Sequence, residues 1–265
     1  MATITLKEFF MKKIDLNFKN RYGFNLAGTL DLPDNKSPDS FGIFAHCFSC
    51  SKQYKLIVNV DNELTKDSFG VFRFDFTGLG ESEGDFSATN FTTNVTDLLD
   101  AISFIESEYG KVDFLLGHSM GAVAAIRASL EINSLRALVT FGAPYSFENL
   151  VKLLEKYKDD FNISNEALIS IGGRDLLVQK PLIEDISSQN IPSFIEKISV
   201  PYMIVHSPTD EMVPYMDALE IFNHVKSSKS FLSVDNANHI FTNNDDSIFA
   251  GRVIKEWLKR YIKNT

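Results

Sequence analysis

The chain has 265 residues, of which 44% are hydrophobic and 23% are charged, and its formal net charge is −9. These values are typical of one large soluble globular domain, and the negative charge argues against a nucleic-acid partner. No apolar run approaches the length that spans a bilayer, and residues 1–13 lack the apolar stretch and cleavage site of a secretory leader. We therefore expect a cytoplasmic protein that binds neither nucleic acid nor a membrane.

The pattern of apolar residues predicts a sheet that is mostly parallel. Residues 14–18 and 24–32 alternate apolar and polar side chains, which is typical of an antiparallel hairpin with one solvated face. A strand buried on both faces is predicted at residues 41–45. Further strands are predicted at 70–76, 111–116, 135–141, 202–206 and 230–234, and helices at 54–66, 90–108, 122–128, 215–225 and 247–263. Strands that alternate with helices predict an α/β fold with a doubly wound sheet.

The alternation of strands and helices breaks between residues 144 and 200. A helix is predicted at residues 147–157, and a hairpin at 167–178 that turns at Gly172-Gly173. We therefore predict an inserted cap at residues 144–200, and a core formed by residues 1–143 and 201–265. Apolar cap residues such as Phe161 and Leu177 are expected to set the choice of substrate.

The segment Gly117-His118-Ser119-Met120-Gly121 stands between a predicted strand and an Ala-rich helix. A G-x-S-x-G sequence in this context is typical of a nucleophile elbow, in which the turn holds the serine in a sparsely populated backbone conformation. Gly117 and Gly121 would let the strand and the helix approach closely, and Ser119 is the predicted nucleophile. Such a pentapeptide can also arise by chance, so the rest of the chain has to support it.

A serine hydroxyl needs a general base, and the base needs an acid that orients it. Asp210 follows the strand predicted at residues 202–206, and His239 follows the strand predicted at 230–234. The carboxyl ends of parallel strands meet at one edge of a sheet. The order Ser119, Asp210, His239 is also the order of an elbow-type triad, so we predict that these three residues are catalytic.

Other carboxylates and histidines compete for these roles. Glu211 adjoins Asp210 and is expected to be a solvated carboxylate at the rim, whereas Glu148 follows an earlier strand and stays an alternative acid. His46 is expected to have a structural hydrogen-bonding role at the start of its loop, and His118 lies beside the nucleophile rather than opposite it. His206 is expected to be a satisfied core histidine, and His224 a surface or packing residue.

Acyl transfer also needs two N–H groups that bind the developing oxyanion. In an elbow-type enzyme one comes from the residue after the nucleophile, here Met120, and the other from the loop after an earlier strand. We assign the second donor to the backbone N–H of Phe48, whose ring is then free to line the acyl pocket. The glycine-rich segment 77–84 lacks the Lys and Ser/Thr of a phosphate-binding loop, so we expect it at the rim of the site.

Cys47 and Cys50 are the two cysteines of the chain, too few for a disulfide framework or a four-thiolate zinc site. No metal and no cofactor is expected. In a reducing cytosol the pair is expected to consist of free thiols packed under the loop. A redox pair is the alternative, in which closing the ring between the sulfurs would displace Phe48 and depress activity.

Four segments carry a resemblance to a known family: His-Cys-Phe-x-Cys-Ser-Lys at 46–52, Phe-Asp-Phe-Thr-Gly-Leu-Gly-Glu-Ser-Glu-Gly at 74–84, the elbow at 117–121, and Ser-Pro-Thr-Asp-Glu at 207–211. With them the chain resembles the α/β-hydrolase superfamily, and is most similar to the hydrolase half of proteins fused to an OsmC-type peroxide-resistance domain. It also resembles cinnamoyl and feruloyl esterases, which carry a small helix-and-hairpin cap. Those relatives usually have His-Gly-Phe where this chain has His-Cys-Phe.

The resemblance implies an α/β-hydrolase fold and a serine carboxylesterase that cleaves small or medium acyl esters through an acyl-enzyme. The alternatives are a serine peptidase or a thioesterase with the same triad, or a non-catalytic binding module of the same fold. The expected partner is a small-molecule ester. A homodimer, and an OsmC-type partner outside this chain, are left open.

Overall fold

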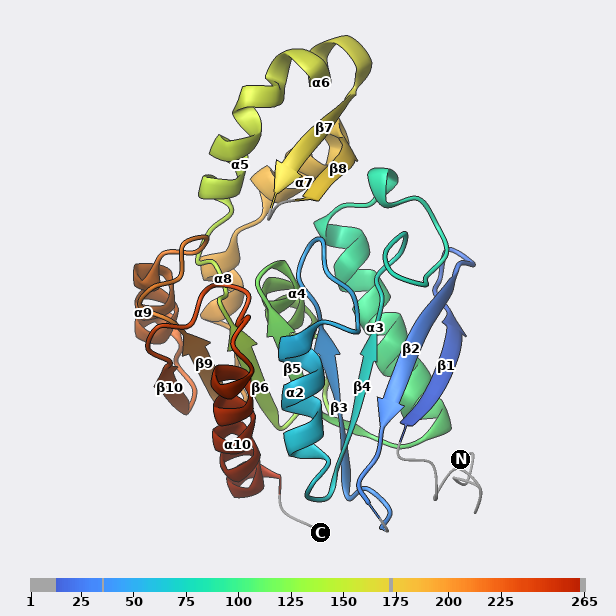
Figure 1. Cartoon of the computed structure of the whole chain (residues 1–265), viewed down its shortest axis with the longest axis vertical. Coiled ribbons are helices and arrows are strands. Elements are labelled where there is room, and N and C mark those ends of the chain that lie inside the picture. The colour runs from blue at the N-terminus through green and yellow to red at the C-terminus, as the bar shows by residue number, and fades with distance from the viewer. Residues whose placement is uncertain (1–12, 35, 172–173, 263–265) are drawn as a thin grey trace.

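The computed structural model describes residues 13–34, 36–171 and 174–262. Their main sheet has eight strands in the order β1-β2-β4-β3-β5-β6-β9-β10 (Figure 1). The strands are β1 (Lys13–Lys19), β2 (Asn25–Asp31), β3 (Ser40–Ala45), β4 (Phe69–Phe74), β5 (Val112–His118), β6 (Ala137–Phe141), β9 (Tyr202–His206) and β10 (Lys229–Ser233). Strands β1 and β2 are antiparallel to their neighbours, and the remaining pairs are parallel. The N-terminal hairpin and the mostly parallel sheet agree with the prediction.

Helices cover both faces of this sheet. Helices α2 (Lys55–Leu64) and α10 (Asn244–Tyr261) lie against one face, and α3 (Phe91–Glu108), α4 (Met120–Ser129), α8 (Ile191–Ile195) and α9 (Tyr215–His224) against the other. No helix in the described ranges is both long and apolar enough to cross a bilayer.

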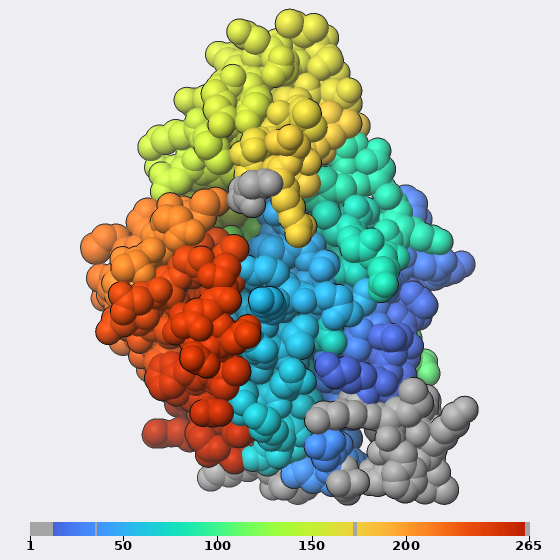
Figure 2. Space-filling model, in the orientation of Figure 1, coloured from blue at the N-terminus to red at the C-terminus, as the bar shows by residue number. Residues whose placement is uncertain are grey.

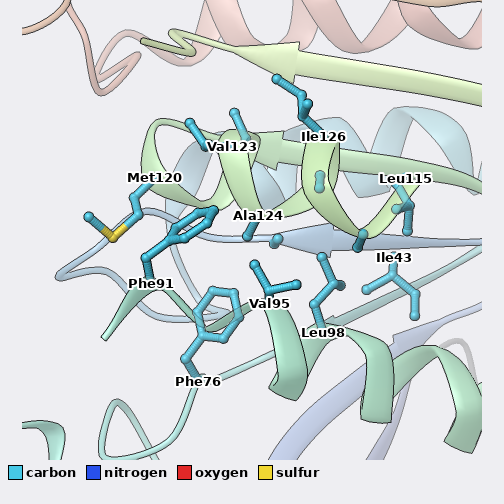
Figure 3. Close-up of a cluster of buried hydrophobic side chains, with 14 of the residues drawn as sticks. Ile43, Phe76, Phe91, Val95, Leu98, Leu115, Met120, Val123, Ala124 and Ile126 are labelled. Atoms are coloured by element: carbon cyan, nitrogen blue, oxygen red, sulfur yellow. The ribbon is translucent and has the colours of Figure 1, made fainter. Parts of the chain in front are cut away.

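Two hydrophobic cores result because successive residues of a strand point to opposite faces. In β3 and β5, Ile43 and Leu115 belong to the core under α3 and α4, whereas Phe44 and Leu116 belong to the core under α2 and α10. Figure 3 shows the first core, where side chains of α3 and α4 meet those of the sheet. The continuous apolar runs of the sequence are therefore strands buried on both faces.

Two helix boundaries show where the apolar pattern was insufficient. Helix α3 begins one residue inside the predicted range because Asn90 and Thr93 form a capping box. Helix α10 begins at Asn244, three residues before the prediction, because Asn243 caps a first turn that is polar and adds nothing to the apolar pattern. The prediction of that boundary was wrong for this reason.

Between β6 and β9 the chain forms a separate lobe above the carboxyl ends of the strands, in yellow-green at the top of Figure 2. It contains α5 (Glu148–Leu154), a 3-10 turn η2 (Glu155–Tyr157), α6 (Lys158–Ser164), the antiparallel pair β7 (Glu166–Ile171) and β8 (Arg174–Gln179), and α7 (Lys180–Ser188). Asp185 of α7 ties the lobe to α3 by accepting hydrogen bonds from the N–H and hydroxyl of Thr92 at 2.7 and 2.8 Å.

The lobe is more helical than the sequence predicted. The helix expected at residues 147–157 gives way to η2 and then to α6, and neither α7 nor α8 was predicted, because their apolar patterns are too short to stand out. The predicted turn at Gly172-Gly173 lies outside the described residues. The cap boundaries at 144 and 200 stay a prediction, and within them α8 packs on α4 and α9 of the core.

Candidate active site

Ser119 lies at the sharp turn between β5 and α4. Its backbone has φ 55° and ψ −120°, a region that residues with a side chain rarely adopt. The turn is held because the Ser119 N–H donates to Phe141 O at 2.9 Å and the Ser119 carbonyl accepts the N–H of Ala122 at 3.0 Å. The strained backbone therefore sits at the residue that the sequence identifies as the nucleophile.

The two elbow glycines are needed for close backbone approach. A Cβ at Gly117 would lie 2.6 Å from Ala122 Cα, and one at Gly121 would lie 2.1 Å from His46 O. Both contacts are with backbone atoms and could not be relieved by a change of rotamer. The start of α4 therefore lies directly against the end of β3, which brings Met120 beside the loop that begins at His46.

His239 and Asp210 come together from the loops after β10 and β9. His239 Nδ1–H donates to Asp210 Oδ2 at 2.8 Å. The other carboxylate oxygen, Oδ1, accepts the N–H groups of Met212 and Val213 at 2.9 and 2.8 Å. Both carboxylate oxygens are satisfied, so Asp210 can hold the imidazole in the tautomer that leaves Nε2 free to accept a proton.

Burial of Asp210 opposes its ionisation, but the hydrogen bond and charge of His239 and the two backbone N–H groups outweigh it. The pKa of Asp210 therefore lies below its usual value. A carboxylate that stays ionised near neutrality can stabilise a positive charge on His239 when the imidazole takes a proton.

Met120 and Phe48 present the backbone N–H groups that the sequence assigned to the oxyanion. The Met120 N–H is in the first turn of α4, where an α-helix offers no internal acceptor. Cys47 O accepts hydrogen bonds from His46 Nδ1–H at 2.6 Å and from the Cys50 N–H at 3.3 Å. Because C=O and N–H of one trans peptide point in opposite directions, these bonds also fix the direction of the Phe48 N–H.

His46 is held at both ring nitrogens. Its Nε2 accepts the N–H of Phe76 at 3.2 Å, so the proton resides on Nδ1. Complete burial lowers the pKa of His46 to about 4, which keeps the ring neutral at physiological pH. The structural role expected for His46 is therefore specific, because this ring orients the peptide that carries the Phe48 N–H.

Cys47 and Cys50 form a disulfide, with their Cα atoms 5.3 Å apart. The expectation of two free thiols was therefore wrong: the tight turn from Cys47 to Cys50 brings the sulfurs together. Phe48 lines the pocket while the ring is closed, and the expectation that ring closure displaces Phe48 stays a prediction. The disulfide restricts the loop in a conformation in which Phe48 lines the same pocket as Ser119.

Reduction of this disulfide is expected to lower kcat by roughly tenfold and to leave KM unchanged, because the oxyanion donor acts mainly in the transition state. The loss should stay below the ~100-fold that removal of a donor costs, since His46 still holds the peptide. Kinetics with and without dithiothreitol measure the effect, and Cys50→Ser should give the reduced value under both conditions. Equal kcat in the two redox states would contradict the prediction.

Two buried cations anchor the far end of the same loop, and sequence reasoning missed both. The Lys52 ammonium contacts the carboxylates of Asp75 and Glu81, and the Lys52 N–H donates to Asp75 Oδ1 at 2.6 Å. Arg73 Nη1 donates to Lys52 O at 2.7 Å. The signals in the sequence were Arg73 within an otherwise apolar strand and Asp75 directly after β4, with Lys52 in the loop that follows β3.

Ser119 and His239 line one pocket under the lobe, with a volume of about 140 Å³. Phe48 and Met120 line it too, so the structure brings these four predicted residues together. Asp210 lies behind His239 and does not line the pocket. The remaining lining residues are Pro144, Ser146, Phe147, Asn149, Leu150, Leu153, Ile171, Met212, Val213, Pro214 and Asp217.

The lobe contributes to this pocket through α5 and the end of β7. The residues singled out from the sequence are different: Phe161 is buried inside the lobe, and Leu177 is 42% exposed. Neither lines the pocket, so an influence of these two side chains on the choice of substrate would have to be indirect and stays a prediction. Which apolar residues of the lobe line the pocket depends on their position along α5, and the number of apolar residues in the segment does not predict that position.

The competing residues have other surroundings. Glu211 is exposed and accepts the His239 N–H at 3.3 Å, while Glu148 is exposed in the first turn of α5. His206 is buried and its Nε2–H donates to Val213 O at 3.0 Å, which supports the loop that carries Asp210. His224 is half-buried and bonds Glu220 O of its own helix.

In the described residues no group of three or more His, Cys, Asp or Glu side chains could hold a metal ion.

His118 is buried beside His239 and its Nε2–H donates to His239 O at 2.9 Å. No described residue offers its Nδ1 a hydrogen-bond partner. Burial, with a smaller contribution from His239, lowers the pKa of His118 to about 3. The unfolded chain, in which histidine has its usual pKa near 6.5, therefore binds the proton first on acidification. Stability from this group is complete above about pH 6.5 and is lost as the pH falls.

We therefore expect wild type to lose about 2 kcal/mol of unfolding free energy from His118 between about pH 7 and pH 5. His118→Gln keeps a donor near His239 O but cannot titrate. The stability difference between the two proteins should narrow by that amount on acidification, as measured by urea unfolding. A difference that does not change with pH would contradict a neutral buried His118.

Comparison with known proteins places these features in a wider group. A family model described as serine aminopeptidase, S33, matches residues 49–185. The esterase domain of a Rhodothermus marinus protein is 34% identical with a TM-score of 0.79, over 95% of this chain and 100% of that domain. Est1E from Butyrivibrio proteoclasticus with ferulic acid bound gives a TM-score of 0.79 at 21% identity, over 93% and 99% of the chains. The second likeness establishes a shared fold alone.

Two curated relatives match parts of the chain. Rat monoglyceride lipase is 41% identical over 63 residues, which are 23% of this chain and 21% of the lipase. Protein phosphatase methylesterase 1 of Candida albicans is 28% identical over 199 residues, which are 66% of this chain and 51% of that protein. The chain thus spans about a fifth and about half of the lengths of these relatives.

Proposed function

The chain belongs to the serine aminopeptidase S33 family of α/β-hydrolases, and on that premise we propose that it is a carboxylesterase for small or medium acyl groups. One observation carries the proposal: His239 donates to Asp210 at 2.8 Å beside the pocket that His239 shares with Ser119. The positive φ of Ser119 and the orientation of the Cys47–Phe48 peptide support it.

In the proposed reaction, Ser119 Oγ attacks the ester carbonyl while its proton passes to His239 Nε2. The ester C–O bond then breaks, and the leaving alcohol takes that proton from His239. A water molecule attacks the acyl-enzyme in the same way, with His239 as the base, and releases the acid and the Ser119 hydroxyl. Asp210 stays ionised throughout and stabilises the imidazolium that forms in each half of the reaction.

The oxyanion of each tetrahedral intermediate would accept hydrogen bonds from the N–H groups of Phe48 and Met120. The value of such donors depends on their being held in place before the reaction begins. Helix α4 fixes Met120, and the His46 hydrogen bond and the disulfide fix the peptide of Phe48. Loss of one such donor typically costs about 10²–10³ in kcat.

The pocket favours a small apolar group on the substrate. A cavity of about 140 Å³ is close in size to an engineered cavity of ~150 Å³ that holds a benzene molecule. Phe147, Leu150 and Ile171 supply apolar walls around it. We therefore expect hydrolysis of p-nitrophenyl esters to peak at short or medium chains and to fall for long ones.

A fluorophosphonate probe tests the proposal directly, since it should label Ser119 and block hydrolysis of the ester series. Failure of both labelling and hydrolysis would contradict it and favour a binding module. Because the family model is named for an aminopeptidase, aminoacyl p-nitroanilides belong in the same assay, along with an acyl thioester. Faster cleavage of an anilide or thioester than of every ester would reassign the reaction while keeping the same residues.

A further inference from the structure

Asp217 is a carboxylate in the wall of the pocket that the reaction as described does not use. Among the described residues that line the pocket, Asp217 and His239 are the ionisable ones, and no Lys or Arg is among them. Asp217 is half-buried in the first turn of α9. Its neighbours along the pocket wall include Val213 and Pro214, which supply apolar surface.

Only one of the two carboxylate oxygens of Asp217 has a partner in the described structure. Oδ2 accepts the N–H of Tyr145 at 3.0 Å. Oδ1 receives no hydrogen bond or ion pair from a described residue. This oxygen is not fully buried, so it remains accessible to solvent. A polar atom of this kind in a mostly apolar pocket can accept a hydrogen bond from whatever fills the pocket.

The charges around Asp217 favour a donor rather than an acceptor. Burial raises the pKa of Asp217, and the charges of Asp210 and Glu220 raise it further. The hydrogen bond from the Tyr145 N–H and the nearby His206 lower it, but by less. The net charge of −9 gives the whole chain a field that attracts cations and repels anions. A donor beside Oδ1 would replace the water lost when the pocket fills, whereas an anion there would meet an uncompensated carboxylate.

We propose that Asp217 determines specificity by selecting esters that carry a hydrogen-bond donor, a hydroxyl or a protonated amine, in the part that fills this pocket. The proposal rests on the proposed function and adds a substrate class to it. A hydrogen bond to a charged group changes a binding constant or a rate constant by about ten- to hundredfold. The alternative role, favourable placement of an acidic residue at the start of α9, predicts no effect of substrate charge.

Four p-nitrophenyl esters of one length test this: hexanoate, 6-hydroxyhexanoate, 6-aminohexanoate and hydrogen adipate. For wild type we expect kcat/KM for the hydroxyl and amine esters to exceed that for hexanoate by roughly tenfold, and that for the adipate to fall below it. Butyrates of hexanol, hexanediol, 6-aminohexanol and 6-hydroxyhexanoic acid repeat the comparison with the groups on the alcohol side. The preference should occur on the side that enters the pocket. A kcat/KM that exceeds that of the unsubstituted ester for the amine alone would mean that Asp217 selects a positive charge rather than any hydrogen-bond donor.

Asp217→Asn retains an oxygen for the Tyr145 N–H and removes the charge. We expect this variant to lower the ratio of kcat/KM for the amine ester to kcat/KM for the adipate ester by about 100-fold. Any general loss of activity affects both esters and cancels in this ratio. Glu256→Gln is the control, since it removes a carboxylate charge on α10, where Glu256 pairs with Lys259 at 3.0 Å, outside the pocket and not among the charges that act on Asp217. This control should keep the wild-type ratios.

Equal rates for the four esters in wild type, or a preference for the adipate, would overturn the role of Asp217, and these measurements need no variant. Wild-type ratios in Asp217→Asn would overturn it as well. Failure of wild type to hydrolyse even plain hexanoate would have a different meaning, because it would contradict the proposed esterase function and the specificity together. Hydrolysis that is equal for all four esters leaves the esterase function standing and removes only the role of Asp217.

Discussion

Ser119→Ala is expected to lower kcat for a p-nitrophenyl ester by about 10⁴ or more, the usual cost of removing a triad nucleophile. The loss should be this large because the Ser119 hydroxyl would form the bond to the substrate, and no other hydroxyl is placed at the elbow. Residual activity would come from the oxyanion donors and the pocket, which the substitution leaves in place.

The fold should survive this change. Alanine also has a Cβ, so it meets the same backbone strain as serine at φ 55°, and the Ser119 Oγ is not needed for the hydrogen bonds that hold the turn. Thermal unfolding should therefore stay close to that of wild type. Ser103→Ala is the matched control, because Ser103 is exposed on α3 and bonds only Leu99 O of its own helix.

Full activity in Ser103→Ala with its loss in Ser119→Ala would assign the reaction to the elbow. Near wild-type turnover in Ser119→Ala would contradict the assignment of Ser119 as the nucleophile, whatever the effect of the substitution on stability. Loss of labelling by a fluorophosphonate should accompany the loss of turnover, since both depend on the same oxygen atom.

The α/β-hydrolase fold could be predicted from the sequence because its signals are local. The run at residues 41–45 is apolar throughout, which a strand buried on both faces requires. The order of Ser119, Asp210 and His239 at strand ends could be read in the same way, because parallel strands bring their carboxyl ends to one edge of the sheet. The topology thus determines which residues can meet.

Features that depend on distances between loops could not be read from the chain. The pairing of Cys47 with Cys50 depends on the turn between them, and the burial of Lys52 depends on Asp75 and Glu81 across a neighbouring loop. Nothing in the sequence distinguishes Asp217 from other acidic residues, and only the approach of α5 makes its surroundings a pocket. Short amphipathic segments such as α7 were missed because one or two turns give too little periodicity.

Asp210→Asn is expected to lower kcat by up to roughly 10⁴, although an amide is nearly the same size as a carboxylate. The geometry explains why the loss should be large. The N–H groups of Met212 and Val213 both donate to Oδ1, so the carbonyl oxygen of an asparagine would face them. Its NH₂ group would then point toward His239 Nδ1, where it can only donate. Nδ1 would lose its proton, Nε2 would gain one, and His239 could no longer accept the proton of Ser119.

Glu148→Gln distinguishes this account from the alternative acid. Glu148 is exposed at the start of α5, whereas Asp210 is buried and hydrogen-bonded to the imidazole. Steady-state kinetics on one short-chain ester should show a small effect for Glu148→Gln and a loss of several thousandfold for Asp210→Asn, with similar KM in both. The reverse order would move the acid to the end of β6. Comparable small effects would mean that His239 keeps its working tautomer without a carboxylate, which the two backbone donors on Asp210 Oδ1 argue against.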